Sequence, residues 1–519
     1  MTTLTPPRRQ ARNHRAAAPR PRHDRRWVAA VGLVAALVAV AWLPFLHAPL
    51  TSDESGFLLL GRHLSHGTSL YGDYWVDRPP LLIWLFGLAG HLGPLSATAV
   101  GVTAPAVKLM GAAASGVSVL LVGVLASRVA PASRWPRRAA VTLAAVLLAS
   151  PLFGMPEADG ELLALPFVLG GLAALVAALR DPGGRRSLVL ATLAGASGAC
   201  ALLVKQNVVD VLLFAAVAWF RCRRRRERTG RQAAAFAGGA LAVVGTAVVL
   251  AALQGTSPAG LWDAVVVFRL HASAVIGSSA TRTTTKRLSR LVQAFVRSGA
   301  AAVLVVSATL VLTRARRRAA PTVATLRWPV LAMLGWELVG VAGGGSYWLH
   351  YLTGLVPGLA LLLCLAVPAS GRARWAGGLL AACLVYATAA NVLAWGQHAT
   401  APAQVTTDDQ VISYLRGHAG RSDGVVVAFG HPDIVTGSGL HCPYPQLWSL
   451  PVRVDDPRLQ QLEQTLSGPD APRWVVVAGD SVGSWGLDAA GAQRYLQEHY
   501  VEQATYGDWH IWQREGGIG

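Results

Sequence analysis

Two acidic residues and a nearby acid–base pair stand out in an otherwise apolar chain. Asp53 and Glu54 follow the first long apolar segment, and Asp77 and Arg78 come just before another. Ionised carboxylates beside a membrane exit are costly unless they are solvated, paired or used. A carboxylate can take a proton from an attacking hydroxyl or amine, and a guanidinium can hold a departing phosphate. Residues 51–82 are therefore predicted to carry the chemistry of this protein.

A second polar group follows about a hundred positions later. Glu157, Asp159 and Glu161 lie within five residues of one another, between two apolar segments. Lys205 and Gln206 end a further apolar segment and add a second cation. A carboxylate base together with cations that neutralise a leaving group is the arrangement that transfer chemistry needs.

Each of these features also has a structural explanation that the sequence leaves open. Ser52 or Asp53 is suited to capping the helix that follows. Lys205 can be a lysine that extends from a helix end to the interface. His350 and Tyr351 follow a glycine run and are candidate binding residues, but aromatic residues at such a position also anchor helices in the interface.

Composition places the chain among membrane proteins. Of its 519 residues, 53% are hydrophobic and 14% are charged, and its mean hydropathy is +0.42. Ordinary soluble domains carry about 25% charged residues. The net charge of +19 comes from arginines that cluster between apolar segments, as in cytoplasmic loops, so no nucleic-acid partner is expected. The five cysteines show no paired spacing, which argues against a disulfide framework and a thiolate metal site.

Apolar segments of about 20 residues predict a polytopic α-helical protein with about eleven transmembrane helices. They lie at 27–47, 104–127, 139–155, 162–179, 188–204, 208–220, 233–253, 299–313, 328–344, 351–367 and 376–395. Residues 1–26 are expected to form a disordered basic tail in the cytoplasm, and 27–398 the membrane domain. Asp210 and Glu337 fall inside predicted spans, where charged groups pair or line a cavity.

The apolar segment 79–96 decides the orientation of the chain. If it crossed the membrane, five arginine-rich loops would lie outside, against the positive-inside rule. Its prolines and glycines also favour short broken helices, so we place it in the outer interface, within an outer catalytic loop at 48–103. The polar motifs then share the outer face of the cytoplasmic membrane. The loop 254–297 would lie there too, and its basic residues, Arg269 among them, violate the positive-inside rule. A contact with a lipid phosphate is the alternative explanation for them.

From about residue 400 the composition becomes that of a soluble domain. Helices are predicted at 407–418, 458–465 and 489–498, and strands at 424–429, 474–478 and 509–513. Residues 400–519 are thus expected to form a small α/β domain outside the membrane. The domain lacks a glycine-rich phosphate loop, so use of a nucleotide sugar there is not expected.

The motifs resemble those of the GT-C superfamily of membrane glycosyltransferases. The nearest group is the protein O-mannosyltransferase and aminoarabinose transferase type, often labelled family 39. Its first outer loop has an Asp-Glu pair, a helical stretch and a Lys- or Arg-Pro-Pro-Leu element, matched here by Asp53-Glu54, Gly56–His63 and Arg78-Pro79-Pro80-Leu81. Later motifs are matched by Asp159-Gly-Glu161-Leu-Leu-Ala-Leu-Pro166, Lys205-Gln206 and His350-Tyr351. The resemblance covers about residues 27–370, and Arg78 replaces the commoner lysine.

This resemblance implies that a sugar moves, with inversion, from a polyprenyl-phosphate donor to an acceptor outside the membrane. The acceptor would be a cell-envelope polysaccharide, lipid or protein. Asp53 would be the general base, Glu54 with Glu161 or Asp159 would bind the acceptor or assist, and Arg78 and Lys205 would hold the lipid phosphate. The remaining substrate-binding candidates are Asp77, Gln206, His350 and Tyr351. Some members use a divalent metal, so Mg or Mn held by Asp53 and Glu161 stays open.

Two other functions compete with this hypothesis. A transporter or lipid-linked sugar flippase is expected to show internal repeats and polar residues near the bilayer midplane. The sequence has no evident repeat, and its polar residues gather at one surface instead. A membrane anchor for an outer binding domain would place all function in residues 400–519.

Overall fold

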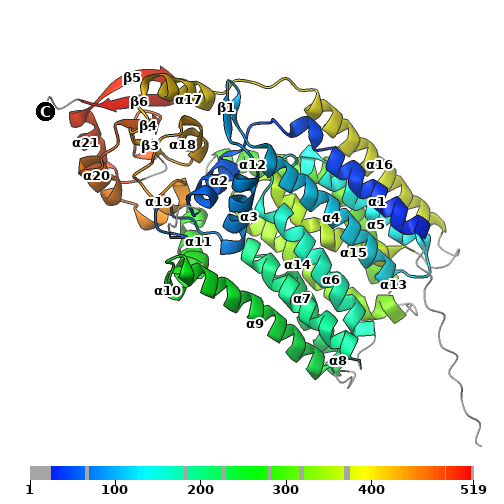
Figure 1. Cartoon of the computed structure of the whole chain (residues 1–519). Helices are drawn as coiled ribbons and strands as arrows, with labels where there is room; N and C mark the ends of the chain where they lie inside the picture. The colour runs from blue at the N-terminus through cyan, green and yellow to red at the C-terminus, as the bar shows by residue number, and fades with distance from the viewer. Residues whose placement is uncertain are drawn as a thin grey trace, which may run out of the picture.

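The computed structural model describes residues 25–64, 69–180, 184–224, 229–278, 282–314, 321–367, 374–484 and 487–515. Except for its last two residues, the predicted tail 1–26 lies outside these ranges. A bundle of long helices makes up most of the molecule, and a small domain with a β-sheet lies at one end of it (Figure 1). The polytopic helical fold with a C-terminal α/β domain is therefore confirmed.

The bundle is built from helices of unequal length. They are α1 (Arg25–Val40), α4 (Pro105–Val129), α5 (Arg134–Leu148), α6 (Gly160–Arg180), α7 (Arg185–Val204), α8 (Asp210–Arg224), α9 (Gly230–Leu253), α13 (Ala300–Arg314), α14 (Pro321–Gly343), α15 (Val356–Ala366) and α16 (Arg374–Ala399). Within the described ranges, eight segments are long and apolar enough to cross a membrane, or nine if the bent pair of α12 (Arg282–Arg297) and α13 is one span. Eight of the eleven predicted spans are among these nine segments; α5 and α8 are too short, with 15 residues each, and α14 is not among the segments that are long and apolar enough.

One span-length segment was not expected. Residues 258–277, which include α10 (Pro258–Trp262) and α11 (Phe268–Ser278), are long and apolar enough to cross a membrane. They belong to the segment 254–297, which is predicted from the sequence to be an outer loop. Their mean hydropathy of 1.4 is the lowest of the eight segments, which is why the pattern did not separate them from the loop.

The apolar segment after the first acidic motif forms a short helix, α3 (Pro80–Leu92). Its 13 residues span about 20 Å at 1.5 Å per residue, less than the hydrocarbon core of about 30 Å. This length agrees with the expected interfacial position. α3 packs on α2 (Ser52–Leu64) where Gly61 meets Gly87, and a side chain at Gly61 would overlap the backbone of Gly87.

The C-terminal domain contains a four-stranded sheet in the order β3-β4-β6-β5. β3 (Val425–Ala428) pairs in parallel with β4 (Trp474–Ala478), while β6 (Trp509–Arg514) pairs antiparallel with β4 and with β5 (Tyr500–Tyr506). The helices of the domain are α17 (Thr407–His418), α18 (Pro432–Ser438), α19 (Ser449–Asp455), α20 (Gln460–Ser467) and α21 (Ala490–His499). The three predicted helices and three predicted strands are present; α18, α19 and β5 were missed.

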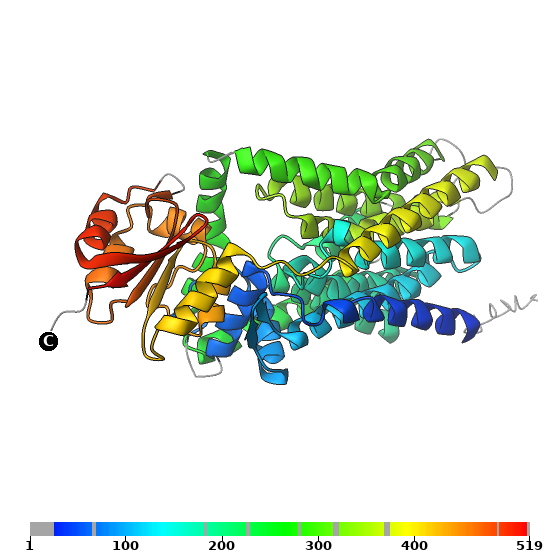
Figure 2. The same ribbon diagram turned by 90° about the horizontal axis from the view of Figure 1, so that it is seen from above.

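The C-terminal domain rests on the segment that follows α1. α18 packs on α2, and the backbone N–H of Trp75 donates to the Pro445 carbonyl at 2.9 Å. A hairpin of β1 (Ser96–Thr98) and β2 (Gly101–Thr103) also contacts α18. The start of α1 lies at the opposite end of the bundle (Figure 2). The two acidic motifs therefore lie near the end that the C-terminal domain covers.

Candidate functional site

Glu54 is buried and holds the start of α2 in place. Its Oε2 accepts from the Thr51 backbone N–H at 2.9 Å, and its own N–H donates to Thr51 Oγ1 at 3.3 Å. This reciprocal pair is a capping box. The cap of the helix is therefore made by Thr51 and Glu54 rather than by Ser52 or Asp53, so capping does not account for Asp53.

Glu54 also connects the two acidic motifs. Lys108, in the first turn of α4, donates to both carboxylate oxygens at 2.7 and 2.8 Å and is 1% exposed. The Ala158 N–H donates to Glu54 Oε1 at 2.8 Å, and Lys108 also donates to the Pro156 carbonyl at 3.1 Å. A buried pair with this many partners compensates for the desolvation of both charges. It joins α2, α4 and the loop that carries the second motif.

Asp53 has different surroundings from its neighbour Glu54. Its Oδ1 accepts a hydrogen bond of 2.9 Å from the indole N–H of Trp448, and the carboxylate faces the charge of Arg78. Burial opposes the charge on Arg78, but Asp77 and then Asp53 outweigh it and raise the pKa of the guanidinium. Asp53 is therefore a carboxylate beside a permanent cation.

Arg78 and Arg269 form a cationic pair around Asp77. Arg78 Nη1 lies 2.9 Å from Asp77 Oδ1, and Arg269 Nη2 lies 2.5 Å from Oδ2. The Gln206 side chain donates to the Asp77 carbonyl at 2.9 Å. The Nε of Arg269 is buried and has no hydrogen-bond partner within the described ranges. Two cations with one carboxylate between them leave positive charge for an anionic ligand.

Glu161, Lys205 and Tyr351 form the next part of the site. Lys205 Nζ contacts Glu161 Oε1 and lies 4.8 Å from the centre of the Tyr351 ring. Glu161 Oε2 is buried without a hydrogen-bond partner in the part of the chain that the structure describes. Tyr351 is within the electrostatic influence of Glu161, Arg78 and Asp53, so this group lies near the first acidic motif.

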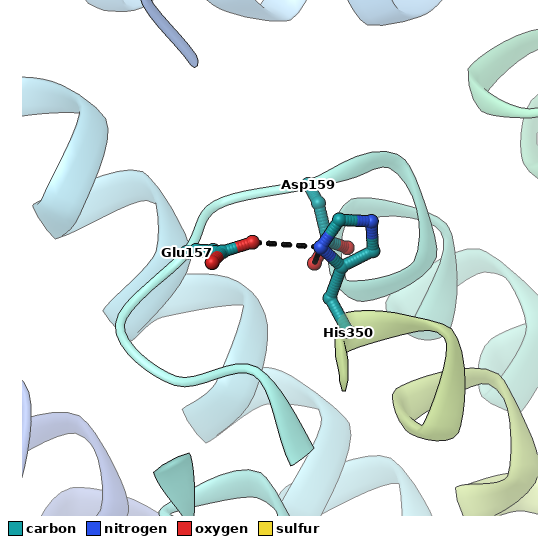
Figure 3. A group of neighbouring side chains, drawn as sticks. All are labelled: Glu157, Asp159 and His350. Carbon is teal, nitrogen blue, oxygen red and sulfur yellow. Dashed lines mark hydrogen bonds and ion pairs between the residues drawn. The ribbon is translucent and has the colours of Figure 1, made fainter. Parts of the chain in front are cut away.

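Glu157, Asp159 and His350 form a third cluster, in which both carboxylates point to one imidazole (Figure 3). His350 Nδ1 lies 2.7 Å from Glu157 Oε2 and 3.6 Å from Asp159 Oδ2. Burial raises the pKa of Asp159 to about 7, although the His350 charge opposes this shift. Gly154 adopts a φ of +94° directly under His350, where a Cβ would lie 2.5 Å from the His350 Cα. Only glycine allows that close approach.

The side chains that could hold a metal are not the predicted pair of Asp53 and Glu161. Among the described residues, two groups bring their ligand atoms within 4.8 Å of one another: Glu157 with Asp159 and His350, and a set of Asp408, His431 and Asp433 in the C-terminal domain. Neither group includes Asp53 or Glu161. Two carboxylates and an imidazole suit Zn²⁺ or Mn²⁺ as ligands, whereas Mg²⁺ prefers oxygen alone. Metal dependence itself stays a prediction.

The two acids inside predicted spans pair with each other. Asp210 at the start of α8 and Glu337 on α14 share a hydrogen bond, and the Gly358 N–H donates to Glu337 at 3.0 Å. Together with Glu161 and Tyr351 they line a cavity of about 40 Å³. A volume of this size holds only a few water molecules.

The ten candidate residues predicted from the sequence lie at one end of the bundle, but two of their partners were not predicted and two were recognised only in part. Lys108 and Trp448 were overlooked, and Glu157 was noticed only as part of its motif. Arg269 was recognised only among the basic residues of the loop 254–297, as a suggested contact with a lipid phosphate. Lys108 carried a detectable signal, because a lysine in the first turn of an apolar span requires a partner. Trp448 lies 395 positions from Asp53, and nothing local to it indicated that contact.

Comparison with solved structures identifies the fold. ArnT from Cupriavidus metallidurans, bound to undecaprenyl phosphate, matches with a TM-score of 0.58 and 12% identity over 94% of this chain and 98% of that one. The oligosaccharyltransferase AglB from Archaeoglobus fulgidus, in complex with an inhibitory peptide and a dolichol-phosphate, matches with a TM-score of 0.51 and 13% identity over 95% of this chain and 75% of that one. The arabinofuranosyltransferase AftD from Mycobacteria matches with a TM-score of 0.51 and 17% identity over 96% of this chain and 40% of that one.

Sequence comparison adds nothing to these structural matches. No protein-family model matches the chain, and no curated protein matches it by sequence. The assignment to the narrower family 39 group thus stays a prediction. The structural matches cover nearly the whole chain, and all are membrane enzymes of one superfamily. This chain has the GT-C fold of membrane glycosyltransferases.

Proposed function

We propose that this protein transfers a sugar from a polyprenyl-phosphate donor to an acceptor at the outer face of the cytoplasmic membrane. One observation carries the proposal: the Asp53 carboxylate faces the charge of Arg78, which shares Asp77 with Arg269. A base beside cations that can hold a phosphate is what this reaction requires. Two of the solved structures with this fold contain a polyprenyl or dolichyl phosphate, which supports the choice of donor.

In this mechanism the acceptor hydroxyl or amine attacks the anomeric carbon of the donor. The bond from that carbon to the phosphate oxygen breaks as the new glycosidic bond forms, with inversion. Asp53 takes the acceptor proton, and the polyprenyl phosphate leaves as an anion. Arg78 and Arg269 stabilise the departing phosphate by charge-assisted hydrogen bonds, and the buried Nε of Arg269 supplies an unused donor.

The other site residues take supporting roles. Glu54 holds the first turn of α2 to α4 and to the second motif, so we assign it a positioning role. Lys205 is oriented by Glu161 and Tyr351 and adds positive charge near the phosphate. Gln206 fixes the backbone at Asp77, which in turn orients Arg78.

A divalent metal would be held by Glu157, Asp159 and His350. Bound there, it would supply additional positive charge beside the phosphate. In its absence His350 can remain in hydrogen-bond contact with Glu157, as the distance of 2.7 Å allows. The transfer reaction described above uses only Asp53 and the cations.

The proposal is tested by measuring sugar transfer from polyprenyl-phosphate sugars in membranes that contain wild-type protein or Asp53→Asn. The variant keeps the shape of the side chain but removes the base, so we expect transfer to fall by at least about 100-fold. Asp73→Asn is a matched control, because Asp73 belongs to the same outer loop and is 42% exposed beside His63. Full transfer by a folded Asp53→Asn protein would overturn the assignment.

A further inference from the structure

The C-terminal domain holds the first turn of α2, the turn that carries Asp53. The Trp448 indole donates to Asp53 Oδ1 at 2.9 Å. On the neighbouring position, Ser52 Oγ donates to Asp433 Oδ1 at 2.7 Å. Two consecutive residues of α2 thus bind two separate segments of a domain that begins about 350 positions later in the chain.

Packing fixes the position of the Trp448 ring. The ring centroid lies 5.6 Å from that of Phe57, also on α2. Gly56 lies directly under the ring, and a methyl group at this position would overlap the Cζ2 and Cη2 atoms of the indole. The absence of a side chain at Gly56 therefore lets the indole approach close enough to reach Asp53.

The hydrogen bond between Ser52 and Asp433 is supported by a polar network within the C-terminal domain. His431 Nδ1 lies 2.8 Å from Asp408 Oδ2 and 4.0 Å from Asp433 Oδ1. Asp408 also accepts from the indole N–H of Trp509 on β6 at 2.7 Å. The network connects the sheet of the C-terminal domain to Ser52.

The hydrogen bond from Trp448 favours the ionised form of Asp53, which is the form that can act as a base. An indole N–H can only donate, so it pairs with a carboxylate and not with an acid proton. Because it occupies Oδ1, the other oxygen of Asp53 remains to accept the proton of an acceptor. Displacing a catalytic group by a small distance lowers the reaction rate, so the fixed orientation of this carboxylate matters.

We propose that Trp448 is a positioning residue for Asp53, and that the C-terminal domain thereby completes the active site in the membrane domain. This inference rests on the proposed function, because it requires Asp53 to be the base. It assigns the C-terminal domain a part in the chemistry that its sequence gave no sign of.

The inference is tested with Trp448→Phe in the full-length protein, assayed with a polyprenyl-phosphate sugar. Phenylalanine keeps a ring against Phe57 but removes the N–H, so we expect kcat to fall about tenfold with the donor KM unchanged. Trp474→Phe is the matched control, because Trp474 also donates its indole N–H to a carboxylate, Asp423, at 3.1 Å, within the sheet of the same domain. We expect it to leave kcat within twofold of wild type.

Gly56→Ala reaches the same contact from the α2 side. The added methyl group displaces the indole, so this variant should reproduce the tenfold loss in kcat. Since both changes break one hydrogen bond, the Trp448→Phe/Gly56→Ala double variant should be no slower than either single variant. Two outcomes would overturn the inference by showing that Trp448 acts only through the fold. In one, the kcat losses of the two single variants multiply in the double variant; in the other, Trp474→Phe loses as much kcat as Trp448→Phe.

The two proposals fail in different ways. If Asp53→Asn keeps full transfer, the proposed function is wrong and the inference falls with it. If Asp53→Asn loses transfer while Trp448→Phe keeps wild-type kcat, the base is confirmed and only the role of Trp448 is refuted.

Discussion

Adjacent residues of the same chemical type have separate roles in this site. Asp53 and Glu54 are both acids in the first turn of one helix. Glu54 is satisfied by Thr51, Lys108 and a backbone N–H, whereas Asp53 accepts one indole N–H and faces Arg78. On an α-helix consecutive residues point about 100° apart, so the two carboxylates are directed to different neighbours. The pair in the sequence is thus one candidate base and one structural anchor.

The ion pair between Glu54 and Lys108 is expected to be essential for stability. In Lys108→Met the Glu54 carboxylate stays buried without its counter-ion, which costs about 3–5 kcal/mol of unfolding free energy. Denaturant titration of the purified protein in detergent measures this loss. Lys286→Met, which removes an exposed lysine on α12, is the control and should change stability by less than about 0.5 kcal/mol. A loss below about 1 kcal/mol in Lys108→Met would contradict the role of the pair.

Arg269 is expected to act on donor binding. Replacing it by glutamine removes one of the charge-assisted contacts to the donor phosphate, and such contacts contribute about 1.5–3 kcal/mol each. We therefore expect Arg269→Gln to raise the donor KM by roughly tenfold or more. Arg290→Gln, at an exposed position of α12, is the control. An unchanged KM in Arg269→Gln, measured over a range of donor concentrations, would remove Arg269 from the phosphate site.

At the scale of elements, the accuracy of prediction follows the strength of the local pattern. The helix 407–418 was predicted with its observed bounds because Thr406 and Asp409 form a capping box at its start. The strand β5 was missed because it lies at an edge of the sheet and exposes most of its residues, so it has no apolar run. Its turn to β6 at Gly507 has a φ of +59°, a conformation that a sequence pattern only suggests.

The contact between the C-terminal domain and α2 is expected to depend on pH. Burial raises the pKa of Asp433 to about 6, against the hydrogen bond from Ser52. Burial lowers the pKa of His431, but its hydrogen bond to Asp408 outweighs this effect and raises it. A group whose pKa is raised on folding stabilises the folded state at low pH. This contribution to stability is lost as the pH rises through the pKa of the folded state. Burial opposes the charge on Asp408, but the hydrogen bond and the charge of His431 lower its pKa. The contribution of Asp408 to stability is therefore lost only when the pH falls.

We therefore expect docking of the domain to weaken as the pH rises from about 4 to about 6, where Asp433 ionises, and further above 6.5, where His431 loses its proton. The measurement is the melting temperature of the full-length protein over this range. His431→Gln removes the imidazole and should flatten the profile. His499→Gln, at an exposed position of the same domain, should not. A wild-type melting temperature that rises with pH over this range would contradict the expectation.

At the scale of the whole molecule, the bundle has two chemically different ends. The candidate site lies at the end that the C-terminal domain covers, and α1 starts at the other (Figure 2). Trp27 near that start bonds to Ser127 and stacks with Arg137, so the first arginine-rich loop lies there too. The positive-inside rule then predicts that this end faces the cytoplasm and that the site lies on the outer face.

This orientation is tested by labelling single cysteines in intact cells with a membrane-impermeant reagent. Asp480→Cys, at a position whose side chain is fully exposed after β4, should label from outside, and Ala132→Cys, in the loop before α5, should label only after lysis. The native cysteines are buried or partly buried, so they give a low background. Labelling of Ala132→Cys in intact cells would refute the orientation.

The sequence by itself determined the membrane class, the GT-C motifs, most elements of the C-terminal domain and the residues that gather at one end. These depend on composition and on patterns within about twenty residues, which a single chain displays directly. The tertiary structure decided which acid is free, which is an anchor, and which cations complete the site. Glu54 with Lys108, Asp77 with Arg269 and Asp53 with Trp448 are contacts between residues 54, 192 and 395 positions apart. Such pairs are fixed by how helices and the C-terminal domain pack, and no local pattern in the sequence encodes them.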